Sequence, residues 1–367
     1  MELLAIWQQT RKVNNDELQT RVKATIASWK SGKFMPLVCR PFSLNSYCLS
    51  KVWFRTHSVD LRVGDVTAIT SACKGWLYQD MFEKPSELLL YRPVEDGGLG
   101  MHHVQCKALS SLISTFLQTA ANPGYQQSLY HSLLYRRHCL LDDTVEIDIP
   151  PYYAGEFFSI IREVVGISPL NPVYMSVKQW YTYILEMKIT MEKIDNEGRM
   201  KAKLCKVEEK YPNPNWQHIF QLSRLKGMSQ GTKSFNFKLI HVIIPCKSRL
   251  SQFLPASSPL CNLCRQQVPE TLAHALAECE KSMEAGEYIL QLTKVYDSSI
   301  TMEKLVRLQV HTDALYELPT MLALCSILEL IWKNRLNKQS TRQYDIRPEL
   351  ECQVLILRKS GNKQATF

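Results

Sequence analysis

The stretch CNLCRQQVPETLAHALAEC, residues 261–279, carries the most informative pattern in this chain. Cys261 and Cys264 are separated by two residues, a gap that lets both thiolates of a tight loop reach one ion. His274 and Cys279 follow on a short segment with apolar periodicity and offer two more ligands. Three thiolates and one imidazole fill a tetrahedral shell, so the pattern predicts a structural Zn²⁺ rather than a catalytic one.

The size of this segment matters for how it would fold. In so small a module, metal binding would supply much of the folding free energy, on the order of 10 kcal/mol. The alternative is three unconnected thiols and a surface histidine, because a chain with twelve cysteines produces some CxxC spacings by chance. The His-x4-Cys pair that follows favours the zinc interpretation.

Composition limits the class of protein. The chain has 367 residues, of which 45% are hydrophobic and 22% charged, as is ordinary for a soluble protein of two or three domains. We expect no signal peptide, because no early apolar run follows a basic N-terminus. We expect no membrane partner, because the longest apolar stretch near the end, Leu318–Trp332, contains Pro319 and Glu329 and is shorter than a membrane span. Apart from the CxxC pair, the cysteines lack framework spacing, which predicts a nuclear or cytoplasmic location.

The net charge of +9 favours a polyanionic partner without requiring one. Basic residues precede and enter the cysteine-rich segment, and the candidate contacts to RNA or DNA among them are Lys226, Lys233, Lys238 and Arg265. A zinc-fixed loop would present Arg265 together with Asn262 and Gln266. The alternative is that these charges only solvate helix surfaces.

Apolar spacing close to the helical period predicts a mainly α-helical fold. The expected helices are residues 18–29, 44–57, 65–82, 103–119, 173–188, 216–225, 233–241 and 321–335. In the third of these, Ile69, Cys73, Trp76 and Leu77 are in helical register, and in the fourth we expect Ala108, Leu112, Thr115 and Phe116 to face inward. A strand stays possible for 173–188, which is rich in β-branched and aromatic residues. Residues 88–91 are short enough for a strand or extended arm, and residues 96–100 form a glycine-rich turn rather than a phosphate loop.

Two sets of residues are open to both structural and functional interpretations. The pattern predicts that six aromatic residues are core rather than base-stacking platforms: Trp53, Phe54, Trp76, Trp180, Trp216 and Phe220. His102, His103 and Cys106 resemble a nucleophile with a base, but no third group orients them, and we expect ordinary histidines.

Two blocks of the sequence carry a family resemblance. The first contains Trp29, Leu49-Ser50-Lys51-Val52-Trp53-Phe54-Arg55, Trp76, Leu90-Tyr91-Arg92-Pro93 and Gly97-Gly98-Leu99-Gly100. The second contains Trp216 to Leu225, Lys233 to His241, the CxxC…Glu270-Thr271…His274…Cys279 pattern and Ile331-Trp332-Lys333-Asn334-Arg335. In this order they resemble the thumb-like segment and C-terminal zinc-binding segment of LINE-type, non-LTR retrotransposon reverse transcriptases.

The resemblance covers roughly residues 15–120 and 210–340, while residues 130–205 match only loosely. It implies a helical thumb-like domain at 1–140, a connecting segment at 141–205 and a zinc-binding segment at 206–290. A helical tail at 291–345 and a basic tail at 346–367 would follow. Because the family's thumb lies along the template-primer duplex, the resemblance makes Lys51, Arg55 and Lys74 candidate backbone contacts; solvated helix charges explain them equally well.

The family's catalytic residues are missing from the sequence. Its polymerase needs an aromatic-Ala-Asp-Asp signature and a further palm aspartate that bind two magnesium ions. The only Asp pair, Asp142-Asp143, falls after the thumb-like segment, and Asp297, Glu303 and Lys304 do not have restriction-nuclease spacing. We therefore expect a non-enzymatic remnant or domesticated piece that binds RNA or DNA, with a structural zinc. The alternatives are a protein-interaction module that docks a partner through the C-terminal helix, or a fragment without function.

Overall fold

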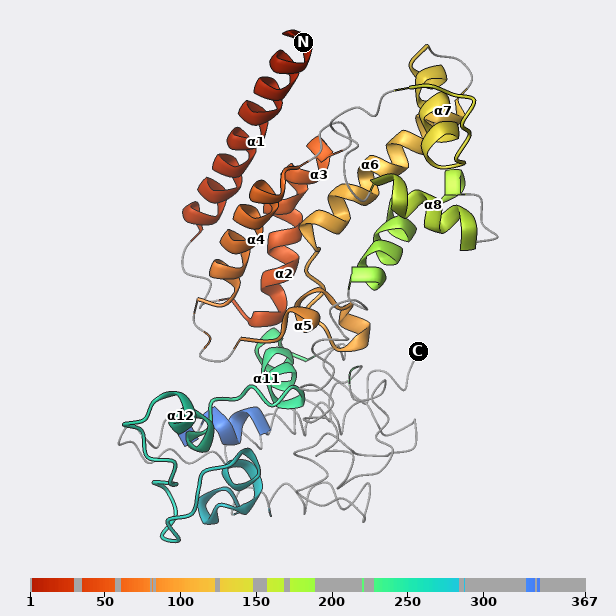
Figure 1. Cartoon of the computed structure of the whole chain (residues 1–367). Coiled ribbons are helices and arrows are strands. Elements are labelled where there is room, and N and C mark those ends of the chain that lie inside the picture. The colour runs from red at the N-terminus through yellow and green to blue at the C-terminus, as the bar shows by residue number, and fades with distance from the viewer. Residues whose placement is uncertain are drawn as a thin grey trace, which may run out of the picture. The chain divides into compact units, whose positions relative to one another are not determined.

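A computed structural model provides the structure of the chain. The residues that it describes are 2–29, 35–56, 61–79, 81, 84–122, 126–147, 157–167, 172–188, 220, 228–283, 287, 328–333 and 335–336. Over these residues the protein is mainly α-helical, which confirms the predicted fold class (Figure 1). Extended pairing in the described part is limited to an isolated antiparallel bridge between Leu260 and Pro269.

The chain divides into two compact units that interleave along the sequence. The first unit comprises Met1–Phe34, Arg40–Gln79 and Met101–Glu209, and the second comprises Met35–Cys39, Asp80–Gly100 and Lys210–Phe367. Two short segments from the N-terminal part of the chain thus belong with its C-terminal half. The boundaries expected from composition and resemblance stay predictions.

Helices build the first unit. Their bounds are α1 Glu2–Ser28, α2 Arg40–Ser43, the π-helix η3 Leu44–Leu49, α3 Ser50–Thr56, α4 Val63–Leu77, α6 Val104–Ala121, α7 Gln126–His138, α8 Phe157–Ile167, the 3₁₀ turn η6 Pro172–Tyr174 and a helix at residues 177–188. The long α1 packs along α4, and α6 packs against α7 (Figure 1). The helix at 177–188 confirms the helical interpretation of that segment over a strand. None of the described helices combines the length and apolar character needed to cross a lipid bilayer.

Apolar spacing predicted the buried faces of α4 and α6. Ile69, Cys73, Trp76 and Leu77 are buried on α4, and Phe116 is buried on α6 against α8. Burial of such side chains is the main favourable term in folding. These residues therefore form the core on which the first unit depends.

The prediction that Phe54 is a core residue is wrong. Its side chain is 85% exposed, whereas Val52 and Thr56 on the same helix are buried. Helix α3 thus turns its Val52 and Thr56 side inward and Phe54 outward. Trp76 and Trp180 are buried as predicted. Trp53 and Phe220 are half-buried, and Trp216 lies outside the described residues.

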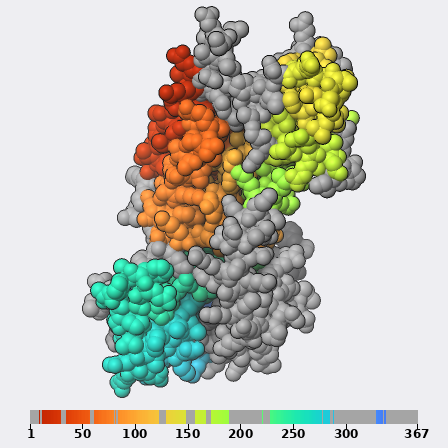
Figure 2. Space-filling view, in the orientation of Figure 1, coloured from red at the N-terminus to blue at the C-terminus, as the bar shows by residue number. Residues whose placement is uncertain are grey.

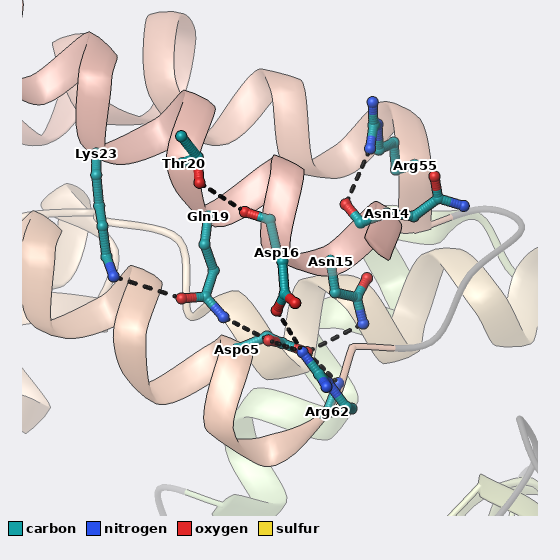
Figure 3. Close-up of polar contacts among 9 residues, drawn as sticks. All are labelled: Asn14, Asn15, Asp16, Gln19, Thr20, Lys23, Arg55, Arg62 and Asp65. Atoms are coloured by element: carbon teal, nitrogen blue, oxygen red, sulfur yellow. Dashed lines mark hydrogen bonds and ion pairs between the residues drawn. The ribbon is translucent and has the colours of Figure 1, made fainter. Parts of the chain in front are cut away.

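A polar network joins α1 to the start of α4 (Figure 3). The buried Asp65 carboxylate accepts hydrogen bonds from Asn15 Nδ2 at 3.0 Å, Gln19 Nε2 at 2.5 Å and Arg62 Nε at 2.7 Å. Arg62 also pairs with Asp16 at 2.9 Å. Burial opposes ionisation of Asp65, but the hydrogen bonds from Arg62 and Gln19 lower its pKa overall. The network therefore keeps a buried charge paired between two helices.

The second unit is built from shorter elements. Their bounds are the 3₁₀ turn η2 Leu37–Cys39, α5 Glu87–Tyr91, the 3₁₀ turn η4 Val94–Asp96, α11 Gln230–Ile240, α12 Lys247–Phe253, the π-helical turn η7 His274–Glu278 and helical residues 328–333 and 335–336, here called the C-terminal helix. The expected strand or arm at 88–91 is wrong, because Ser86 caps a short helix there and accepts a hydrogen bond from Leu89 N–H. The helix expected at 233–241 is confirmed by α11. That at 216–225, apart from Phe220, and the first part of 321–335 lie outside the described residues.

The glycine-rich turn after α5 is confirmed, and other atoms of the same chain occupy the space beside its glycines. Gly97 and Gly100 have φ values of +80° and +67°, in the region that favours glycine. A Cβ on Gly98 would lie 2.0 Å from the Arg92 carbonyl oxygen. His241 Nε2 lies 2.7 Å from the Gly97 carbonyl oxygen, which ties the turn to the end of α11. These contacts fit the structural interpretation of the turn.

Candidate metal centre

The first two cysteines lie on a loop closed by backbone hydrogen bonds. The Cys261 N–H donates to the Val268 carbonyl at 2.9 Å, and the Glu270 N–H donates to the Pro259 carbonyl at 2.8 Å. Gln267 takes a positive φ of 47° where the loop turns back. The loop therefore brings Cys261 and Cys264 close together and returns the chain towards the next ligands.

A π-helical turn carries the other two ligands. The His274 N–H donates to Thr271 Oγ1 at 3.1 Å at its start, and the Cys279 N–H donates to the His274 carbonyl at 2.8 Å at its end. An i→i+5 hydrogen bond brings residues five apart to the same side of the turn, which an α-helix does not do. The sequence spacing His-x4-Cys thus matches the local backbone geometry.

The four predicted ligands converge. The Cys261, Cys264 and Cys279 sulfurs and a ring nitrogen of His274 all lie within 4.8 Å of one another, and all four residues are buried. Cys261 Sγ and Cys279 Sγ are 3.9 Å apart, and Cys264 Sγ and His274 Nε2 are 3.5 Å apart. Leu263 and Val268 pack against the cluster. The arrangement can hold one metal ion, whereas scattered thiols would not meet in this way.

Two residues that the sequence analysis did not assign to the centre lie directly against it. Arg335 Nη2 donates hydrogen bonds to Cys261 Sγ at 2.9 Å and to Glu270 Oε2 at 2.8 Å. The Arg335 and Glu270 side chains are each 2% exposed. The other Glu270 oxygen accepts a hydrogen bond from the Lys247 N–H at 3.3 Å. No local pattern predicts a contact between residues this far apart in sequence.

Hydrogen bonds make Cys261 an unusually acidic thiol. Burial opposes ionisation, but backbone N–H groups of Leu263 and Cys264, followed by His274 and Arg335, lower the pKa of Cys261 to about 6. Burial raises the pKa of Cys264. The thiolate is the form of cysteine that binds metal, so the surroundings of Cys261 favour its ligand form.

Two of the three candidate nucleic-acid contacts of the first unit, Lys51 and Arg55, form contacts between helices, and the third, Lys74, is half-buried on α4. Lys51 Nζ donates to Thr25 Oγ1 at 2.6 Å. Arg55 donates to the Asn14 carbonyl at 3.0 Å and pairs with Glu17 at 3.3 Å. All three contacts join α3 to α1. They account for Lys51 and Arg55 by helix packing, and a role in binding RNA or DNA stays a prediction.

The candidates of the second unit divide by exposure. Arg265 is exposed on the cysteine loop, whereas Lys233 and Lys238 are half-buried on α11. Lys226 lies outside the described residues. In the space-filling view the segment from α11 to the metal centre, coloured green to teal, forms part of the surface of the second unit (Figure 2). The exposed Arg265 is thus the basic candidate nearest in sequence to the metal ligands.

The histidine pair has structural partners. His103 Nδ1 accepts a hydrogen bond from the Cys106 N–H at 3.3 Å and so caps α6. The His102 ring contacts the rings of Trp53 and Tyr181, and burial lowers its pKa to about 4. These contacts support the interpretation of ordinary histidines.

The aspartate pair also has structural partners, because both carboxylates form surface ion pairs. Asp142 pairs with Arg136 at 2.5 Å, and Asp143 pairs with Arg137 at 2.6 Å.

In comparisons with known proteins, no family model and no curated protein matches the chain.

Proposed function

We propose that Cys261, Cys264, His274 and Cys279 bind a structural Zn²⁺. In a tetrahedral zinc site, bond lengths of about 2.3 Å to sulfur and about 2.0 Å to nitrogen place two sulfurs about 3.8 Å apart, and a sulfur and a nitrogen about 3.5 Å apart. The separations of 3.9 Å between Cys261 Sγ and Cys279 Sγ and 3.5 Å between Cys264 Sγ and His274 Nε2 match two of the six ligand–ligand distances of such a site, and all four ligand atoms lie within 4.8 Å of one another. Three thiolates favour Zn²⁺ over Mg²⁺ or Ca²⁺, which prefer oxygen ligands.

The zinc centre would serve a non-catalytic module that binds the backbone of RNA or DNA. The observation that carries this proposal is the convergence of the four ligands, in the order in which they occur in the zinc-binding segment of LINE-type reverse transcriptases. The net charge of +9 and the exposed Arg265 on the zinc loop support a polyanionic partner. On the basis of the resemblance, we propose that the two sequence blocks that carry it correspond to the thumb-like and zinc-binding segments of such a protein.

Burial within the second unit weighs against docking of a protein partner through the C-terminal helix. Three apolar residues of that helix, Leu328, Ile331 and Trp332, are 1%, 3% and 8% exposed. Their apolar surface is already covered, so these residues offer little for a partner to bury.

Fluorescence anisotropy with a labelled RNA hairpin tests the proposal. Purified full-length protein would be titrated across a salt series, with zinc content measured in parallel. We expect one zinc per chain, and binding that weakens steeply with salt because Lys and Arg displace counterions from phosphates. The double variant Cys261→Ser/Cys264→Ser should lose zinc and weaken binding, whereas Cys39→Ser, at a half-buried thiol outside the centre, should change neither.

Arg265→Gln separates the charge from the zinc. It should retain zinc but bind the hairpin more weakly, with a salt slope shallower by about one contact. If the triple variant Lys226→Gln/Lys233→Gln/Lys238→Gln leaves affinity and salt slope unchanged, the basic residues before the centre are not contacts. Folded, zinc-loaded wild type that does not bind the hairpin would contradict the nucleic-acid proposal.

A further inference from the structure

Arg335 brings a positive charge into the interior of the second unit. The residue is 3% exposed, and its Nη2 lies between Cys261 Sγ and the Glu270 carboxylate. A buried charge is costly unless it is paired and hydrogen-bonded. Nη2 has two such partners: the sulfur of the candidate metal ligand Cys261, and the Glu270 carboxylate, which holds the guanidinium in place.

The charge of a loaded centre would make the contact between Arg335 and Cys261 electrostatically favourable. A divalent ion with three thiolates and a neutral imidazole carries a net charge of about −1. That charge would be buried, because Cys261, Cys264, His274 and Cys279 are all buried. Arg335 supplies one positive charge at hydrogen-bond distance from a ligand sulfur. With the buried Glu270 carboxylate included, the formal charges of ion, ligands, guanidinium and carboxylate sum to about −1, whereas without Arg335 they would sum to about −2.

We propose that Arg335 is a positioning residue of the metal centre, which offsets the negative metal–thiolate charge through Cys261, and that Glu270 orients it. This inference rests on the proposed zinc site and deepens it. Groups that hydrogen-bond to metal ligands fix their orientation and tune their electron density. Both hydrogen bonds come from Nη2. A guanidinium suits this buried position because it is always charged and is more weakly hydrated than an ammonium group.

The contact also couples the metal to a distant part of the chain. Arg335 belongs to the C-terminal helix, which is separately held to α11 by a hydrogen bond from Thr232 Oγ1 to Glu329 Oε2 at 2.6 Å. If Arg335 stabilises the loaded centre, the metal must stabilise docking of that helix by the same free energy. The zinc would then organise α11, the cysteine loop and the C-terminal helix as one unit rather than the loop alone.

The test compares four variants of the full-length protein with wild type. Zinc affinity is measured by competition with a chromophoric chelator, and the thiolate-to-metal charge-transfer band is recorded after loading with Co²⁺. Arg335→Met should weaken zinc binding about 10- to 100-fold. It should also shift the Co²⁺ band to lower energy, because a sulfur without its hydrogen bond is more electron-rich.

Two variants refine the test. Arg335→Lys keeps the charge and should recover part of both the affinity and the band position. Glu270→Gln leaves Arg335 in place but weakens its orientation, and it gives a second measurement if Arg335→Met does not fold; about a tenfold loss of affinity is expected.

Glu329→Gln is the matched control, because it loosens the same helix at its contact with α11 without touching the centre. It should leave the Co²⁺ band unshifted and weaken zinc binding less than Arg335→Met, because it acts on the centre only through docking of the helix. The inference is overturned if Arg335→Met and Glu270→Gln bind zinc like wild type with an unshifted band. It is equally overturned if Glu329→Gln weakens zinc binding as much as Arg335→Met and neither shifts the band, since helix docking alone would then explain the loss. Wild type that takes up no zinc would instead refute the proposed function on which the inference rests.

Discussion

The helical core of the first unit and the metal centre of the second are both buried, but different kinds of side chain fill them. In the first unit, large apolar residues such as Phe116, Ile69 and Leu77 are almost fully buried along long helices. In the second, the cluster around the centre consists of Cys261, Cys264 and Cys279, with Leu263 and Val268 packed on it. The core of the first unit is thus stabilised by buried apolar area, whereas the buried cluster at the metal centre consists mainly of ligand residues. The comparison predicts that each region fails for a different reason.

Metal removal should have the largest effect, confined to the second unit. A chelator, or the variant Cys261→Ser/Cys264→Ser, would remove binding free energy on the order of 10 kcal/mol. Amide hydrogen exchange measured by mass spectrometry should then show loss of protection at residues 258–283 and weaker protection of α11 and the C-terminal helix, while peptides from α4 and α6 keep theirs. Retained protection at 258–283 after complete metal removal would show that the loop folds without an ion.

The corresponding change in the apolar core of the first unit is Phe116→Ala. Phe116 is 1% exposed, and its ring contacts Phe157 and Phe158. Truncation should cost about 3–5 kcal/mol, because it removes apolar contacts and leaves a cavity. Urea unfolding followed by tryptophan fluorescence should report this loss, with zinc affinity unchanged. A fall in zinc affinity would mean that the two regions are not energetically separate.

Asp65→Asn tests the polar network between α1 and α4, at a cost of about 2 kcal/mol for weakened hydrogen bonds to a charged group. The pKa of Asp65 is lower in the folded state than its usual 3.8. Its contribution to stability is therefore complete above the unfolded pKa and is lost as pH falls through the folded pKa. Wild type should lose stability below about pH 4, and Asp65→Asn should lack that part of the acid dependence. If the two proteins had identical profiles of stability against pH, ionisation of Asp65 in this network would not contribute to the stability of the fold.

Phe54→Ala should have the smallest effect. The side chain is 85% exposed, so its removal should change the free energy of unfolding by less than about 0.5 kcal/mol. Val52→Ala on the same helix is the matched comparison, because Val52 is fully buried. Its loss should be clearly larger in the same urea titration. Equal losses for the two variants would contradict the orientation of α3.

Helical period and ligand spacing carried most of what the sequence could reveal. The spacing of Ile69, Cys73 and Trp76 predicted the buried face of α4, and the CxxC and His-x4-Cys spacings predicted which four residues converge. Phe54 shows the limit, because composition does not indicate which side of a short helix faces inward. Arg335 shows a second limit, since a contact to Cys261 across the fold leaves no local signal.

The interleaving of the two units has a consequence for dissecting the protein. Val38 N–H donates to Ser234 Oγ at 3.2 Å, and the Gly97 carbonyl oxygen lies 2.7 Å from His241 Nε2, so segments at 35–39 and 80–100 complete the unit that carries the metal centre. A single cut before residue 210 would release a fragment without either segment. Neither unit is therefore formed by one continuous segment, so a fragment truncated at that point would misrepresent the behaviour of the intact chain.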